Sequence, residues 1–215
     1  MIITFIAPPA AGKGTLSIKV SQKWNIPHIS TGDLLRNVED ENVKQKLSEG
    51  KFISDNIVIS LLEKRIKESD AKNGYILDGF PRNLNQAKMY ETLLQKLNLN
   101  QGIVIILDLD KEMAAKRITH RKVCPNCGAI YNDMFESTKP KVKNICDNCQ
   151  NNLIKRSDDN MKTFEDRYQT YLNETYPLVK YYENKGIAYH VKCMDNLDDT
   201  FIEVKKIIGV LYDKH

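Results

Sequence analysis

A lysine and a threonine near the N-terminus are the first residues suited to chemistry. Lys13 and Thr15 stand in a segment of small residues that spans 7–15. Backbone N–H groups of such a loop can point at a phosphate, a lysine adds a mobile positive charge, and a threonine hydroxyl can ligate the accompanying Mg²⁺. The segment therefore predicts a binding loop for a polyphosphate. The alternative is a tight turn between a strand and a helix.

The loop departs from the regular phosphate-loop expression G-x-x-x-x-G-K-[ST] at two positions. Ala7 occupies the place of the first glycine, and Gly14 occupies the place of the hydroxyl residue, which comes one position later. The loop alone therefore leaves both interpretations open.

An acid and an arginine follow a short apolar stretch at 75–77. Asp78 and Arg82 come directly after this predicted strand. In an open parallel sheet, ligands bind beyond the carboxyl ends of the strands. Asp78 is thus suited to ordering water around Mg²⁺, and Arg82 to clamping a phosphate. A turn with a surface ion pair is the alternative, and it fits a central strand less well.

A second polar group follows the predicted strand at 26–29. Ser30 or Thr31 is suited to capping a helix, and Arg36 lies one turn into that helix. A capped helix start with an arginine can hold a second phosphate. Taken singly, capping alone for Thr31 and a solvated face for Arg36 are equally good interpretations.

Two further arginines, Arg117 and Arg121, stand four residues apart in a predicted helix at 111–121. This spacing places them on one helical face, where like charges repel. An anion held between them would explain the arrangement. Enrichment of Lys and Arg at a helix C-terminus is the ordinary alternative.

Four cysteines form two C-x2-C pairs with 18 residues between the pairs. They are Cys124, Cys127, Cys146 and Cys149. The pattern is typical of a tetrahedral site with four thiolate ligands and no open coordination position. We therefore expect a structural metal, zinc or iron, that holds together a segment of low apolar content. A zinc ribbon that grips nucleic acid through Lys139, Lys141 and Lys143 is the weaker alternative.

These groups need a scaffold, and the chain alternates apolar strands with helices. The predicted strands are 2–6, 26–29, 75–77, 102–109 and 187–191. The predicted helices include 16–24, 38–50 with Gly50 as its stop, one starting at Asp55 or Asn56, 84–97, 111–121 and 162–183. The last helix is expected to dock through Phe201, Val204, Ile207, Ile208 and Leu211. This alternation predicts an α/β fold, a doubly wound five-stranded parallel sheet with two inserted segments.

The composition is ordinary for a soluble protein of 215 residues, which suffice for one domain with insertions. Lys and Arg number 32 against 28 Asp and Glu, too small an excess to argue for nucleic-acid binding. No stretch is long enough to span a membrane, and the N-terminal apolar run lacks the charged start of a signal peptide. We therefore expect a cytoplasmic protein, in which Cys193 is a buried thiol.

The order of the motifs resembles the adenylate kinase family in its zinc-containing, long-lid form. The segments are PPAAGKGT, ISTGDLLR, LDGFPR with Gln86 four residues after Arg82, RITHR, CPNCGAIY, CDNC, KRSDD and FEDRY, in this order across nearly the whole chain. The resemblance implies the P-loop nucleoside monophosphate kinase fold and reversible phosphoryl transfer from MgATP to AMP, giving two ADP. It implies a core at 1–29, 54–121 and 160–215, an AMP-binding subdomain at 30–53 and a zinc-stapled lid at 122–159.

The resemblance also implies roles for individual residues. The ATP-binding residues would be Ala10, Ala11, Gly12, Lys13, Gly14, Thr15, Arg117 and Arg121. The AMP-binding residues would be Thr31, Arg36, Gly79, Arg82, Gln86, Arg156 and Arg167. The catalytic residues would be Lys13, Arg82, Arg117, Arg121, Arg156 and Arg167. Asp33 and Asp78 resemble the pair that holds the water shell of Mg²⁺, and Asp158 and Asp159 resemble the acids that fix the closed lid.

The chain departs from the family pattern in its phosphate loop. Ala7 and Ala10 replace glycines, which costs about 1–2 kcal/mol at any site that needs left-handed dihedrals. An active adenylate kinase is therefore weighed against a nucleotide-binding or zinc-dependent interaction module with weak or no turnover. A kinase for another nucleoside monophosphate is a third hypothesis, against which Gln86 argues because it would read an adenine edge. We expect a monomer that binds neither nucleic acid nor a membrane.

Overall fold

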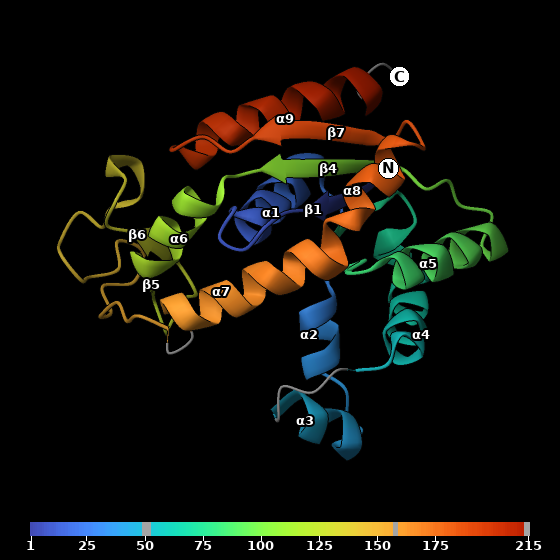
Figure 1. Cartoon of the computed structure of the whole chain (residues 1–215), viewed down its shortest axis with the longest axis horizontal. Helices are drawn as coiled ribbons and strands as arrows, with labels where there is room; N and C mark the ends of the chain where they lie inside the picture. The colour runs from blue at the N-terminus through green and yellow to red at the C-terminus, as the bar shows by residue number, and fades with distance from the viewer. Residues whose placement is uncertain (49–52, 157–158, 213–215) are drawn as a thin grey trace.

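The apolar run at the N-terminus forms the central strand of a five-stranded sheet with the order β2-β3-β1-β4-β7. The strands are β1 (Ile2–Ile6), β2 (His28–Ser30), β3 (Tyr75–Asp78), β4 (Ile103–Asp108) and β7 (Ala188–Lys192). This computed structural model describes residues 1–48, 53–156 and 159–212. Every pairing in the sheet is parallel, so the carboxyl ends of the strands share one edge (Figure 1). The predicted α/β fold with a parallel sheet is confirmed.

Helices cover both faces of the sheet because successive residues of a strand point to opposite sides. Ile3 and Phe5 of β1 face one side and belong to a core shared with two helices. These are α1 (Lys13–Trp24) and α9 (Leu197–Tyr212). Ile2 and Ile6 belong to the cores of the other side. The helices there are α4 (Asp55–Ile66), α5 (Leu84–Lys96) and α8 (Pro177–Glu183).

Two inserted segments interrupt the alternation of strands and helices. The first contains α2 (Thr31–Arg36) and α3 (Glu41–Ser48). The second, named here the β5–β6 segment (residues 121–156), contains β5 (Arg121–Val123) and β6 (Ile130–Asn132). Figure 1 shows the two segments extending from the sheet at separate places.

The predicted helix at 111–121 is wrong at its C-terminal end. Helix α6 (Lys111–Thr119) stops before Arg121, which begins β5. Arg121 pairs with Asn132 in the antiparallel ladder of β5 and β6. Arg117 and Arg121 therefore do not share a helical face. A pairing partner further along the chain is a tertiary feature that helical spacing does not reveal.

The predicted helix at 162–183 is divided into two. Helix α7 (Met161–Thr170) passes into a π-helical turn, Tyr171–Thr175, before α8 begins. The N–H of Tyr176 donates to the carbonyl oxygen of Tyr171 at 2.8 Å, which is the wide hydrogen bond of such a turn. Pro177 lacks an N–H and its ring collides with the carbonyl four residues earlier, so a regular α-helix cannot continue into α8.

Two smaller predictions also need correction. Helix α3 begins at Glu41 rather than at residue 38, because the carboxylate of Asp40 accepts the N–H of Val43 at 3.3 Å and caps the helix there. Its predicted stop, Gly50, lies outside the described residues. In α9, Val204 and Ile208 are buried as predicted, whereas Leu211 is 37% exposed. No helix in the described part of the chain is both long enough and apolar enough to cross a membrane.

Candidate functional site

The phosphate loop leads from β1 into α1, and two of its residues have left-handed backbone conformations. Ala10 has a φ of 64° and Gly12 a φ of 82°. Gly12 caps α1 without a side-chain hydrogen bond, and the first turn of the helix contains no acidic residue. Its N–H groups are therefore available to a phosphate, which the helix dipole also favours. Ala7 does not have a positive φ, so only Ala10 is strained by the loss of glycine.

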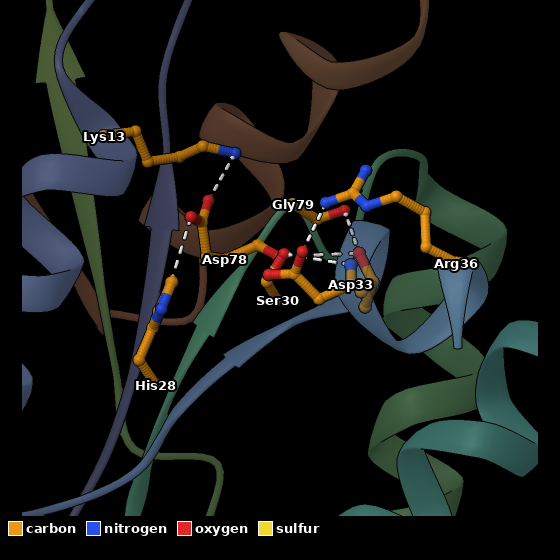
Figure 2. A network of polar contacts seen from close by, with 8 residues as sticks. Lys13, His28, Ser30, Asp33, Arg36, Asp78 and Gly79 are labelled. Carbon is orange, nitrogen blue, oxygen red and sulfur yellow. Dashed lines mark hydrogen bonds and ion pairs between the residues drawn. The ribbon is translucent and has the colours of Figure 1, made fainter. Parts of the chain in front are cut away.

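Asp78 lies at the carboxyl end of β3, between two nitrogen atoms. Lys13 Nζ is 3.0 Å from one carboxylate oxygen, and His28 Nε2 is 3.1 Å from the other. Figure 2 shows both side chains pointing at Asp78 from separate elements. Burial opposes ionisation of Asp78, but the hydrogen bond with His28 and the charge of Lys13 outweigh it and lower its pKa to about 2. The carboxylate therefore stays charged and orients Lys13.

Thr31 and Gly79 connect the ends of β2 and β3. The Thr31 hydroxyl donates to the carbonyl oxygen of Gly79 at 3.0 Å, and Arg82 Nε donates to the same oxygen at 3.0 Å. The cap of α2 is Ser30, whose hydroxyl accepts the N–H of Asp33 at 3.3 Å (Figure 2). Thr31 therefore does not serve as the cap, and its hydroxyl links the two strand ends.

Gln86 lies in the first turn of α5, and its side chain folds back on the backbone of Arg82. The N–H of Arg82 donates to Gln86 Oε1 at 2.8 Å. Asn83 caps α5 by accepting the N–H of Gln86 at 2.8 Å, which fixes this turn. Thr31, Gly79, Arg82 and Gln86 thus form one hydrogen-bonded group, although they come from two distant parts of the sequence.

Asp33 and Arg36 form an ion pair within α2 (Figure 2). The hydrogen bond from Arg36 lowers the pKa of Asp33, burial opposes this, and a hydrogen bond with Ser30 adds to the lowering. Both side chains are exposed. A ligand that needs either charge has to compete with the other member of the pair.

A cavity of about 360 Å³ separates the phosphate loop from the β5–β6 segment. The predicted ATP-side residues that line it are Ala10, Gly12, Thr15, Arg117 and Arg121. Apolar side chains, among them Phe135 and Leu197, supply another part of the wall. A cavity with cations and backbone donors on one side and apolar surface on the other suits a phosphate attached to an aromatic base.

Arg117 reaches this cavity from α6. Its Nη2 donates to the carbonyl oxygen of Met194 at 2.7 Å, and its guanidinium lies over the ring of Phe135, 5.3 Å from the ring centre. Its Nε is buried and has no hydrogen-bond acceptor within the described ranges. Because a buried donor without an acceptor is costly, Arg117 would gain a hydrogen bond if a bound anion drew its guanidinium toward the cavity.

Arg121 reaches the cavity from β5, and its guanidinium forms a two-point ion pair with Asp159. Nε of Arg121 donates to Asp159 Oδ2 at 2.8 Å, and the second contact joins Nη2 to Oδ1. Asp158, the other acid predicted to fix the lid, lies outside the described residues. Arg156 and Arg167 occupy exposed positions before and within α7, and neither lines the cavity.

The four cysteines of the β5–β6 segment come together. Their sulfur atoms all lie within 4.8 Å of one another. Sγ of Cys124 is 3.3 Å from that of Cys149, and Sγ of Cys127 is 3.5 Å from that of Cys146. A tetrahedral zinc site with Zn–S bonds of about 2.3 Å has S···S edges of about 3.8 Å. The cluster therefore fits one tetrahedrally coordinated ion if these two short sulfur–sulfur distances lengthen slightly.

Sequence reasoning missed His28 and Phe135. His28 stands at the start of β2, whose pairing brings Ser30 opposite Asp78. A polar residue in a strand that neighbours the one carrying Asp78 is the signal that could have indicated His28. Phe135 carries no such signal, because only the folding of the β5–β6 segment brings it over Arg117.

The phosphate loop between β1 and α1, with basic side chains beyond the carboxyl edge of a parallel sheet, defines the class of P-loop nucleotide-binding proteins. Residues 5–187 match the sequence model of the family described as Adenylate kinase. The chain belongs to the adenylate kinase family, and it has the P-loop nucleoside monophosphate kinase fold.

Three relatives illustrate how far the similarity extends. The chain is 37% identical over 214 residues to an adenylate kinase of Thermotoga neapolitana, with 96% of each chain covered. It is 38% identical over 215 residues to one of Clostridioides difficile, with 97% of this chain and 99% of the relative covered. It is also 38% identical over 214 residues to one of Archaeoglobus fulgidus, with 97% and 98% covered. The similarity therefore includes both inserted segments.

Proposed function

We propose that the chain transfers a phosphoryl group reversibly from MgATP to AMP, giving two ADP. Membership of the adenylate kinase family makes it a phosphotransferase. The observation that carries the proposal is one cavity lined by the phosphate loop at the start of α1 and by Arg117 and Arg121. Lys13 belongs to the same loop, and its Nζ lies 3.0 Å from a carboxylate oxygen of Asp78.

On the ATP side, the backbone of the phosphate loop would hold the phosphates. The residues of this group are Ala10, Ala11, Gly12, Lys13, Gly14 and Thr15. Lys13 would exchange its contact with Asp78 for one with a phosphate oxygen, because the carboxylate and the phosphate are both anionic and the lysine side chain is flexible. Arg117 would offer its unsatisfied Nε, and Arg121 would share its guanidinium between Asp159 and the nucleotide.

On the AMP side, the linked group at the ends of β2 and β3 would bind the acceptor nucleotide. We assign to the AMP site the members of this group, Thr31, Gly79, Arg82 and Gln86, together with Arg36, Arg156 and Arg167. Asp33 and Asp78 would hold water bound to the Mg²⁺ that arrives with ATP, as carboxylates do for this ion. Both acids are ionised for this purpose, since their surroundings lower the pKa of each.

The chemistry asks for positioning and positive charge rather than for a covalent intermediate. During phosphoryl transfer, negative charge spreads over the equatorial oxygens, and fixed cations that surround them lower the barrier. We propose Lys13, Arg82, Arg117, Arg121, Arg156 and Arg167 as these cations. The β5–β6 segment would close over the cavity that it already borders and exclude water, which would otherwise accept the phosphoryl group.

We also propose that the four cysteines bind one structural Zn²⁺. Four thiolate ligands leave no open position for substrate, and the segment that they hold contains only a small apolar cluster of its own. Iron suits the same ligands, and metal analysis of the purified protein distinguishes the two. We further propose the subdomain boundaries of the resemblance, with a lid at 122–159, and a cytoplasmic monomer that binds neither nucleic acid nor a membrane.

The test is ADP formation from MgATP plus AMP, measured beside MgATP alone. Activity that requires AMP is expected, and Lys13→Ala should lower it by about 10²-fold or more, as for loss of a group that stabilises transition-state charge. Lys19→Ala is the matched control, because Lys19 lies on the same helix and pairs with exposed Asp198. A Lys13 variant as active as the Lys19 variant would contradict the assignment.

The strained conformation of Ala10 favours one competing function, a nucleotide-binding module with weak or no turnover. That function predicts that ATP raises the melting temperature of the protein while no ADP forms. A kinase for another monophosphate predicts faster turnover with GMP, UMP or CMP than with AMP. Side-by-side rates with the four acceptors separate these outcomes.

A further inference from the structure

The side-chain amide of Gln86 is held at both of its ends. Its Nε2 donates to Asp55 Oδ1 at 2.7 Å, and its Oε1 accepts the backbone N–H of Arg82 at 2.8 Å. Gln86 is only 3% exposed, so water does not compete freely for these positions. Asp55 is the first residue of α4 and lies 31 positions before Gln86 in the chain.

The carboxylate of Asp55 is itself fixed from its other side. Asn85 Nδ2 donates to Asp55 Oδ2 at 2.6 Å. The two carboxylate oxygens thus serve two neighbouring residues of α5, one each. Asp55 therefore cannot turn away from Gln86 without losing a second hydrogen bond.

These partners permit only one orientation of the Gln86 amide. An ionised carboxylate only accepts hydrogen bonds, and a backbone N–H only donates them. In the flipped amide, the oxygen would face the Asp55 carboxylate and the NH₂ group would face the N–H of Arg82. Both hydrogen bonds would then become repulsive contacts between buried groups, which costs more than their simple loss.

The fixed amide retains one N–H donor and one oxygen lone pair for a ligand. The edge of a 6-aminopurine offers a ring-nitrogen acceptor beside an amino donor, which this order of groups complements. A 6-oxopurine offers the reverse order, a ring N–H donor beside an oxygen acceptor. An amide free to flip would accept either base, whereas an amide held in place accepts only one when the phosphate anchors the nucleotide.

We infer that Asp55 is a specificity-determining residue, which makes the site select 6-aminopurine over 6-oxopurine monophosphates by fixing the Gln86 amide. The inference rests on the proposed function, in which Gln86 reads the base of AMP. Asp55 acts through Gln86 and is therefore a positioning residue rather than a catalytic one.

The test replaces Asp55 by a residue of nearly the same shape that can either accept or donate. In Asp55→Asn, the new amide can serve either end of Gln86, so a flip of Gln86 is opposed by the N–H of Arg82 alone. We expect the ratio of kcat/KM for AMP to kcat/KM for IMP to fall about tenfold or more, because sites built to match hydrogen bonds discriminate strongly. IMP is the suitable probe because it differs from AMP in the 6-substituent and its ring proton alone. The KM for MgATP should not change.

A purely structural role for Asp55 predicts a different result. Loss of an acid from the first turn of α4 would lower thermal stability and would reduce turnover of AMP and IMP by the same factor. An unchanged AMP-to-IMP ratio in a folded Asp55→Asn protein would overturn the inference. If this variant does not fold, Asp55→Ser carries the same expectation, because a hydroxyl also accepts or donates.

Two further variants separate the inference from the proposed function. Asp70→Asn is the matched control, since Asp70 pairs with Arg65 on the surface and should leave the ratio unchanged. Gln86→Ala should raise the KM for AMP. If it does not, the proposed AMP site fails and the inference fails with it. If it does, and Asp55→Asn keeps the ratio, the inference alone fails.

Discussion

Arg121 and Asp159 form a buried ion pair that joins the start of the β5–β6 segment to a residue two positions before α7. The side chain of Asp159 is 0% exposed and that of Arg121 is 17% exposed. Two parallel contacts of a guanidinium with a carboxylate fix distance and orientation together. The pair therefore clamps the base of the segment that borders the cavity.

Removing one partner of this pair should be costly. In Asp159→Asn, the charge of Arg121 loses its counterion in a largely buried place, and we expect the free energy of unfolding to fall by about 3 kcal/mol. Urea denaturation measures the change. Glu165→Gln is the control, because Glu165 pairs with Lys111 at half-exposed positions, where about 0.5 kcal/mol is typical. Equal losses in both variants would contradict the clamp.

Replacement by glycine should change the melting temperature in opposite directions at the two alanines of the phosphate loop. Ala10 has a left-handed φ, so Ala10→Gly relieves strain of about 1–2 kcal/mol against a smaller entropic cost, and the melting temperature should rise. Ala7 lacks a positive φ, so Ala7→Gly should only add chain entropy to the unfolded state and lower the melting temperature. Calorimetry of both variants checks the difference, and a lower melting temperature for Ala10→Gly would refute it.

The low pKa of Asp78 makes stability depend on pH in a defined window. Its pKa is lowered from 3.8 to about 2, so the folded state binds this proton more weakly than the unfolded state does. The resulting stabilisation, about 2 kcal/mol, is fully present above pH 4 and is lost as the pH falls toward 2. The difference in unfolding free energy between the wild type and Asp78→Asn should shrink across this window. A difference that stays constant from pH 6 to pH 2 would show that the carboxylate is not stabilised in its charged form.

Removal of the metal should lower the thermal stability of the protein rather than take away a group that acts in the reaction. A chelator that strips the cysteine cluster is expected to unfold the β5–β6 segment and lower the melting temperature, because binding free energy at such a site is folding free energy. Circular dichroism with parallel metal analysis measures both quantities. Cys127→Ser should have the same effect, whereas Cys193→Ser, at a thiol outside the cluster, should not lower the metal content. An unchanged melting temperature in the metal-free protein would contradict the structural role.

The sequence by itself determined the class of fold and the sets of candidate residues. Apolar runs bounded by polar loops predict buried parallel strands wherever they lie, and the spacing of Cys124, Cys127, Cys146 and Cys149 predicts a tetrahedral cluster. These signals are local, because strand burial and ligand spacing involve neighbours in the chain. For the same reason, Lys13 could be identified in the loop that follows the first strand, and Asp78 at the end of another strand.

Only the tertiary structure decided how these groups are combined. Arg121 lies outside the helix that contains Arg117, because it pairs with Asn132 of β6. The two arginines nevertheless line the same cavity, each from a different element. The contacts of His28 with Asp78 and of Asp55 with Gln86 could not be derived from the chain alone, since the partners are distant in sequence. Hydrogen bonds and ion pairs depend on the distance and direction between atoms, and folding sets both for residues that sequence spacing leaves unrelated.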